Sequence, residues 1–238
     1  MKRNVRDIIF LTIRVTLLAS VLLNIALFIA TLLRNAGQET SEIFSLYSKN
    51  FEFIFCALIT FVLSFGSSVI ETRQKIDIPD ILEIIIVLFI YASIFLSSRF
   101  NLYYTYFWWD DLLHTMSGVI IGFIGFIVIY KINHKYSMDI SPVLVALFSF
   151  TFAVTLGVVW EILEFSCDVC IGSANQKWDL PDTEILMGRP YQGRGLRDIM
   201  SDLIVDSIGA FITSVITYHL YKNQRKEILE KMHKMIKE

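Results

Sequence analysis

The chain has 238 residues, of which 55% are hydrophobic and 18% are charged, and its mean hydropathy is +0.57. These values exclude an ordinary soluble domain, because the apolar residues gather in long runs that contain few charges. The formal net charge of −2 gives no indication of a nucleic-acid partner, so we expect an integral membrane protein.

The apolar runs predict six membrane-spanning helices, since a helix needs about 20 mostly apolar residues to cross the hydrocarbon core. In chain order the expected spans cover residues 15–33, 51–70, 81–98, 112–130, 142–160 and 203–221. The first run is too long for a signal peptide and should remain as an anchor. We therefore expect an all-α fold, with one helical bundle over residues 1–221 and a basic amphipathic tail over residues 222–238.

Lys and Arg are more numerous on the side of the membrane that holds both termini, which the positive-inside rule assigns to the cytoplasm. That side holds Lys2, Arg3, Arg6, Arg14, Arg73, Lys75, Lys131, Lys135 and the basic residues of the tail. The other side holds Arg34, Lys49, Arg99, Lys177, Arg189, Arg194 and Arg197. Both termini should be cytoplasmic, and the segment 161–197 should face outward.

Three acidic clusters lie where the expected spans four, five and six meet the outer side. The clusters are Asp110, Asp111 and His114; Glu161, Glu164 and Asp168; and Asp198, Asp202 and Asp206. An ionised carboxylate costs several kcal/mol in hydrocarbon. The clusters therefore need positive charge, water or protonation, and we expect them to form one site.

The first cluster begins span four, where an aspartate can cap the free backbone N–H groups of a helix. Capping explains Asp110 or Asp111 but does not explain His114, which shares a helix face with both at spacings of four and three. An imidazole beside carboxylates can be a metal ligand, a general base or a structural hydrogen-bonding group.

The second cluster depends on where the helix of span five ends. If the helix continues past Trp160, then Glu161, Glu164 and Asp168 lie at its negative end and need a cationic partner from elsewhere. If the helix ends at Trp160, they are solvated loop acids.

The third cluster steps by four residues and forms a stripe on one helix face. Asp198 can be an N-cap. Asp206 lies well inside the apolar run, so it must face the bundle interior or a polar cavity. Asp202 and Asp206 are either functional or part of a buried polar network that holds helices together.

Several smaller features accompany the clusters. Gly118 and Gly122 have the spacing that lets two membrane helices approach closely. Arg189, Arg194 and Arg197 alternate with glycines in the outer segment, and they can bind a phosphate headgroup or pair with the carboxylates. The Cys167–Cys170 pair is compatible with a redox or metal role, a local disulfide or simple packing.

Three motifs resemble an uncharacterised family of multi-pass bacterial membrane proteins typified by YjdF. They are Trp108-Trp109-Asp110 leading to Leu113-His114 and Ser117-Gly118, then Trp160-Glu161-Ile162-Leu163-Glu164, then Gly195-Leu196-Arg197-Asp198 through Asp202-Leu203-Ile204 to Gly209-Ala210. The resemblance covers about residues 79–210, and the start of span four is more loosely similar to VanZ-type proteins. It implies a bacterial membrane location and a shared polar core, and it implies no reaction.

The sequence as a whole predicts an outward-facing polar site that holds a divalent cation or a linked proton network. The candidate metal ligands are Asp110, Asp111, His114, Glu161, Glu164, Asp198, Asp202 and Asp206; the candidate catalytic residues are His114, Glu161 and Glu164; and Arg189, Arg194 and Arg197 are the candidate substrate-binding residues. The substrate would be a lipid-linked phosphate. The alternatives are an ion-coupled transporter and a non-catalytic accessory or lipid-sensing protein.

Overall fold

The computed structural model describes residues 5–35, 41–74, 78–172, 174–178, 188 and 193–223. Helices account for nearly all of this described part, which contains no strand. Six helical segments are long and apolar enough to cross a membrane: Val5–Arg34, Leu46–Arg73, Asp80–Phe100, Trp109–Tyr136, Pro142–Cys170 and Arg194–Lys222. The predicted all-α class and the six spans are confirmed, and each observed segment is longer than the predicted span.

The helices belong to two compact units, whose described residues lie within 1–106 and 107–223. The first unit contains spans one to three, and the second contains spans four to six. The predicted tail over residues 222–238 lies almost wholly outside the described residues.

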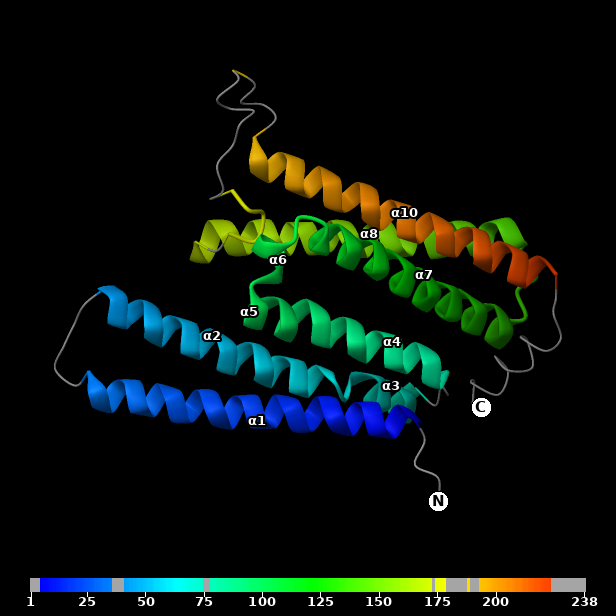
Figure 1. Ribbon diagram of the computed structural model, residues 1–238. Helices are drawn as coiled ribbons and strands as arrows, with labels where there is room; N and C mark the ends of the chain where they lie inside the picture. The colour runs from blue at the N-terminus through cyan, green and yellow to red at the C-terminus, as the bar shows by residue number, and fades with distance from the viewer. Residues whose placement is uncertain are drawn as a thin grey trace. The chain divides into compact units, whose positions relative to one another are not determined.

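In the first unit, α1 (Val5–Arg34) packs antiparallel to α2 (Ser41–Leu63), as Figure 1 shows. A break at Ser64 and Phe65 separates α2 from α3 (Gly66–Gln74). The buried core of this unit joins α1 to α2 and to the third span. Its buried members are Phe10, Ile13, Leu17, Val21, Ala57, Val87 and Phe95.

The third span combines α4 (Asp80–Ile90), the π-helical turn η1 (Tyr91–Leu96) and α5 (Ser97–Phe100). In the π-helical turn the backbone hydrogen bonds join residues five apart instead of four. The hydroxyl of Ser97 also donates to the carbonyl of Ala92 at 2.8 Å. The span ends at Asn101, whose φ of 51° is left-handed, and α6 (Leu102–Thr105) follows. Tyr103 of α6 donates back to the carbonyl of Ser93 at 3.0 Å, which ties α6 to the span.

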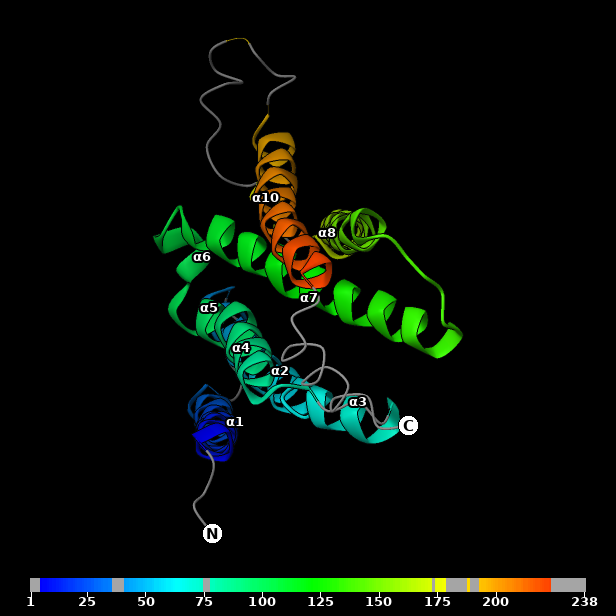
Figure 2. The same cartoon turned by 90° about the vertical axis from the view of Figure 1, so that its right-hand side faces the viewer.

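The second unit consists of α7 (Trp109–Tyr136), α8 (Pro142–Ile171) and α10 (Arg194–Lys222), each of which packs against the other two. Figure 2 looks along α8, shows α10 obliquely, and shows α7 crossing beside them. Ser141 caps α8 by accepting from the backbone N–H of Leu144, and Pro142 occupies the first helical position. Gly172, with a φ of 70°, ends α8.

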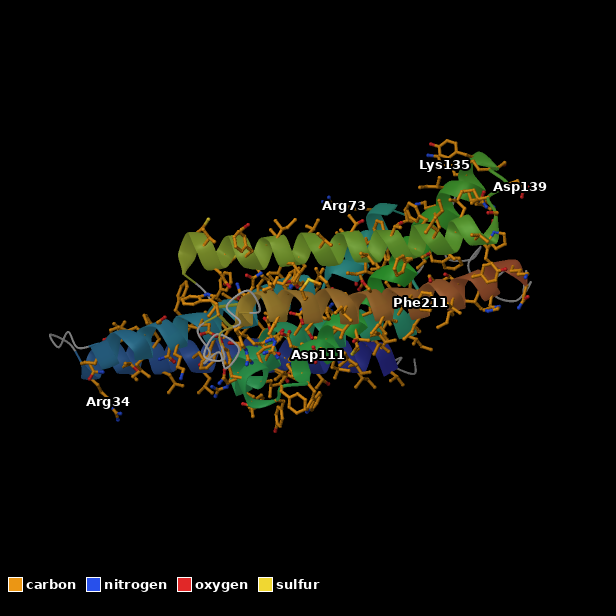
Figure 3. The ribbon with its side chains drawn as sticks, turned by 90° about the horizontal axis from the view of Figure 1, so that it is seen from above. Arg34, Arg73, Asp111, Lys135, Asp139 and Phe211 are labelled. Carbon is orange, nitrogen blue, oxygen red and sulfur yellow. The ribbon has the colours of Figure 1, made fainter. Side chains whose placement is uncertain are left out.

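The chain direction brings the acidic ends of these three helices together, because α7 and α10 begin at the end of the unit where α8 finishes. Figure 3 labels Asp111 near the start of α7, with Lys135 and Asp139 at its far end. In the first unit the same view separates Arg34 and Arg73, which the sequence assigns to opposite membrane faces. The expectation that the clusters of spans four and six converge is therefore confirmed within the second unit.

Candidate functional site

The centre of the acidic end is His114, a buried residue one turn into α7. Its Nδ1 lies 3.3 Å from Oδ2 of Asp206, while its Nε2 lies 3.6 Å from Oδ1 of Asp110 and 3.9 Å from Oδ2 of Asp202. Because an ionised carboxylate only accepts hydrogen bonds, Nδ1 is the nitrogen that donates to Asp206. The two contacts of Nε2 are longer than hydrogen bonds, so three ligand atoms surround a gap.

Asp206 of α10 contacts both of the other helices in this unit. Its carboxylate accepts from Nδ1 of His114 and from the hydroxyl of Ser117, both on α7. It lies against Gly157 of α8, where an added Cβ would come within 2.7 Å of Oδ2. Asp206 is 3% exposed, so the prediction that it faces the bundle interior is confirmed.

Lys177 supplies the positive charge that the acidic end requires. Its ammonium donates to Oδ2 of Asp110 and, at 2.7 Å, to Oδ1 of Asp198. Burial lowers the pKa of Lys177, but the two carboxylates outweigh that effect and raise it above its ordinary value of 10.5. The sequence reasoning missed this residue, treating it only as one of several basic residues on the outer side.

The segment 174–178 carries Lys177 into the site. The carboxylate of Asp168 accepts from the backbone N–H groups of Asn175 and Gln176 at 2.9 and 3.0 Å, which closes the turn. Lys177 itself has a φ of 50°, a left-handed conformation that is uncommon outside glycine. A basic residue eight to ten positions after a helix-terminal acid is the signal that could have identified it.

Glu161 and Glu164 lie on α8, which continues to Ile171, so the prediction of a continuing helix is confirmed. Glu161 is 5% exposed, and neither carboxylate oxygen has a hydrogen-bond partner among the described residues. Its charge interacts with those of Glu164, His114, Asp198 and Asp206. Glu164 instead accepts from Nε1 of Trp160 at 2.8 Å.

Close packing of α7 on α10 sets the distances between His114 and the aspartates of α10. A Cβ on Gly118 would collide with the carbonyl of Asp206, and a Cβ on Gly209 would collide with the carbonyl of Thr115. Two backbone surfaces therefore meet at a crossing that only glycine permits. The predicted role of Gly118 in close helix approach is confirmed, and Gly122 contacts Thr213 in the same interface.

The replacement Gly118→Ala should lower the free energy of unfolding by about 1–3 kcal/mol, because a backbone carbonyl cannot move aside as a side chain can. The matched control is Gly66→Ala, since no atom lies within 4 Å of a Cβ at Gly66. Alanine favours both helices equally, so the control should lose no stability. Unfolding of the two purified variants in detergent measures the difference, and equal stabilities would contradict the close crossing.

The structure also corrects the capping interpretations. Trp108 is the N-cap of α7 and makes no side-chain cap hydrogen bond, so neither Asp110 nor Asp111 caps that helix. Asp198 is not an N-cap, because α10 begins at Arg194 after Gly193. Hydropathy locates the apolar stretch only, and the polar first turns of α10 precede it.

The remaining candidates lie around this centre. Asp111 accepts from the hydroxyl of Ser201 at 3.0 Å and is not among the three grouped ligand atoms. Arg194 and Arg197 are exposed in the first turn of α10, and Arg194 interacts electrostatically with Asp198. Arg189 lies outside the described residues. Cys167 and Cys170 are free and exposed, so they form no disulfide.

The donor atoms that could hold a metal are Oδ1 of Asp110, Nε2 of His114 and Oδ2 of Asp202, all within 4.8 Å of one another. Metal–ligand bonds of about 2.0–2.2 Å place neighbouring ligand atoms roughly 3–4 Å apart. The two imidazole–carboxylate distances, 3.6 and 3.9 Å, lie in this range. Asp206 stands behind His114 in the position of an outer partner that orients a metal-bound imidazole.

Comparisons with known proteins agree with a membrane protein. An uncharacterised protein of Thermotoga maritima is 25% identical over 154 residues, which cover 65% of this chain and 70% of that protein. No solved structure matches the chain. The resemblance to YjdF is consistent with these findings, which name neither YjdF nor VanZ. Because a family described as "Predicted membrane protein (DUF2238)" matches residues 16–223, the chain belongs to that family of multi-pass membrane proteins.

Proposed function

We propose that this protein is a membrane metalloprotein whose second unit binds one divalent cation through Asp110, His114 and Asp202. The observation that carries the proposal is the gap in front of His114 Nε2, where two carboxylate oxygens approach to 3.6 and 3.9 Å. Asp202 is 2% exposed. Bringing an imidazole and two carboxylates together at that depth is costly unless a cation or proton joins them.

The donor set narrows the choice of metal. Two carboxylates and one imidazole suit Mg²⁺, Mn²⁺ or Zn²⁺, whereas the absence of thiolate and thioether donors among the three disfavours Cu⁺. Asp206 fixes the orientation of the His114 ring. Lys177 occupies the other oxygen of Asp110, so Asp110 joins the ammonium to the cation site.

Metal content tests the proposal directly. The parent protein, equilibrated with Mn²⁺ or Zn²⁺ and desalted, should retain metal, and Asp202→Asn should lose it. Asp206→Asn should weaken binding by about 10–100-fold, because outer partners of metal-bound histidines contribute to affinity by that amount. Equilibrium dialysis followed by elemental analysis gives both the content and the affinity.

Asp111→Asn is the matched control, since Asp111 adjoins Asp110 in sequence but bonds to Ser201. This variant should bind metal as the parent does. Equal metal content in the parent and in Asp202→Asn would contradict the proposal, as would a parent protein that binds no divalent ion.

The chemistry that fits such a site is transfer or hydrolysis at a lipid-linked phosphate. Arg194 and Arg197 lie in the same first turn of α10 as Asp198, where their guanidinium groups can take phosphate oxygens. A bound cation would polarise the phosphoryl group. Glu161 is the best-placed general base, because His114 uses Nδ1 on Asp206 and turns Nε2 to the cation. The charge bias favours the outer face for this end, and the family resemblance favours a bacterial cytoplasmic membrane.

A second candidate is coupled movement of protons or ions, favoured by the depth of the ionisable chain. Asp206 lies twelve residues into the sixth span, and its neighbours His114 and Asp110 lead back to Lys177. A proton on His114 could replace the cation in the same gap. Reconstituted vesicles that show a pH-dependent ion flux, abolished by Asp206→Asn, would favour this candidate over the metal enzyme.

A further inference from the structure

A separate cavity of about 340 Å³ lies in the first unit between α1 and α3. Its size is within the range of small-ligand sites. Charged and apolar groups share the wall, with Arg6, Arg14 and Glu71 beside Phe10 and Leu11. Nothing in the proposed metal site involves these residues.

Arg14 is the unusual member, because it lies inside the first span. Its guanidinium donates through Nη2 to the carbonyl of Ser64 at 2.8 Å and through Nε to the Ser64 hydroxyl at 3.2 Å. Both acceptors are offered by the break between α2 and α3. The ring of Phe65 lies 3.7 Å from Cζ and supports the flat face of the group.

These contacts orient Arg14 without neutralising it. Arg14 forms no ion pair in the part of the chain that the structure describes, and Nη1 has no hydrogen-bond acceptor there. Arg6 differs, since its guanidinium pairs with Asp7, Asp80 and the buried Glu83. A charged arginine beside the apolar run is costly unless an anion joins it. Glu83 interacts electrostatically with Arg14 but forms its ion pair with Arg6, so the cavity wall presents a cation that has no ion pair of its own among the described residues.

The same cavity also presents carboxylates. Glu71 accepts from the backbone N–H of Ile78 through Oε1, which leaves Oε2 available, and Asp7 lines the wall with a partly exposed side chain. An anion alone would meet repulsion from these acids. A ligand that carries both a phosphate and an ammonium group would satisfy Arg14 and the acids together.

We propose that this cavity binds the headgroup of an aminophospholipid, with its phosphate at Arg14 and its primary ammonium at Glu71 and Asp7. We favour a lipid over a soluble ligand, because Leu11, Val15 and Leu18 form an exposed apolar face beside the cavity. The acyl chains can lie along that face while the headgroup occupies the cavity. A quaternary ammonium cannot donate hydrogen bonds to the carboxylates, so phosphatidylethanolamine is preferred over phosphatidylcholine.

Native mass spectrometry of the full chain, released from detergent after incubation with one lipid at a time, tests the preference. Phosphatidylethanolamine should bind about tenfold more tightly than phosphatidylglycerol or phosphatidylcholine, since one charge-assisted hydrogen bond separates them. Arg14→Gln should weaken all three lipids. Glu71→Gln keeps an oxygen for the Ile78 N–H and should reduce only the preference for the primary ammonium, since Asp7 remains.

The matched controls are Arg34→Gln, at the exposed far end of α1, and Glu52→Gln, an exposed acid on α2. Both should bind lipid as the parent does. Equal binding of the three lipids by the parent would overturn the proposal, and so would an unchanged preference in Glu71→Gln. If soluble phosphoethanolamine displaced the lipid completely, the proposal that the ligand is a membrane lipid would be contradicted. Metal content should be unaffected throughout, which separates this site from the one in the second unit.

Discussion

Lys177→Met should lower the free energy of unfolding by about 3–5 kcal/mol, the range found when one partner of a buried ion pair is removed. The Lys177 side chain is 11% exposed, as are the side chains of its partners Asp110 and Asp198. Methionine preserves most of the volume but leaves two carboxylates close together without a cation. Unfolding of purified protein in detergent measures the loss.

Two variants separate this charge effect from simple loss of packing. Lys135→Met replaces an exposed lysine at the opposite end of the same unit and should change stability by less than about 0.5 kcal/mol. The double variant Lys177→Met with Asp198→Asn should recover part of the loss, because one of the two uncompensated carboxylates is removed. A single variant as stable as the parent would show that Lys177 is not the counter-charge.

The pH dependence of stability follows from the raised pKa of Lys177 in the folded state. The ammonium stabilises the fold fully below the ordinary lysine pKa of 10.5, and this contribution is lost as the pH rises through the higher folded value. The stability difference between the parent and Lys177→Met should therefore be constant from neutral pH to about pH 10 and decrease above it.

The sequence predicted the convergence of the acidic clusters because two simple regularities were sufficient. Spans alternate in direction, so the ends of α7, α8 and α10 that carry acids must share a face. Helical spacing then aligns Asp202 with Asp206, and Asp110 with His114. Both regularities act over short stretches of regular structure, where pattern and geometry correspond directly.

The partners of these acids could not be predicted in the same way. Arg189, Arg194 and Arg197 were possible counter-charges, as an alternative to a phosphate-binding role, yet the ion pairs of Asp110 and Asp198 are made by Lys177. Its position depends on a left-handed residue and on two backbone N–H groups bound by Asp168, which no periodic pattern encodes. Loop backbone geometry, more than residue type, selects the ion pair.

The sequence also could not predict that the carboxylate of Glu161 lacks a hydrogen-bond partner among the described residues. Spacing gives Glu161 and Glu164 similar surroundings on α8, since they differ by less than one helical turn. In the structure only Glu164 reaches Trp160, while Glu161 turns to the buried centre and finds no donor. A buried carboxylate without a partner calls for an explanation, such as a catalytic role or a bound ion or water, and Glu161 is therefore the most direct test of the proposed chemistry.

Glu161→Gln should lower turnover of a lipid-linked phosphate by about 10²–10⁴-fold, the usual contribution of a general base. The same change should leave metal content intact, because Asp110, His114 and Asp202 keep their ligand atoms. It should also leave stability unchanged or raise it, since a buried carboxylate without a partner is replaced by a neutral group. The assay uses metal-loaded protein in mixed micelles that contain a lipid pyrophosphate, with release of inorganic phosphate as the readout.

Glu164→Gln is the matched control, because it makes the same chemical change three residues along α8 at a side chain that already has a partner. The control should retain turnover within a few-fold of the parent. Equal loss in both variants would assign the effect to the charge of the helix end and would contradict a specific base. A parent protein that binds metal but releases no phosphate would support the cation site and contradict the proposed enzymatic activity. The two can be separated because only the activity depends on Glu161.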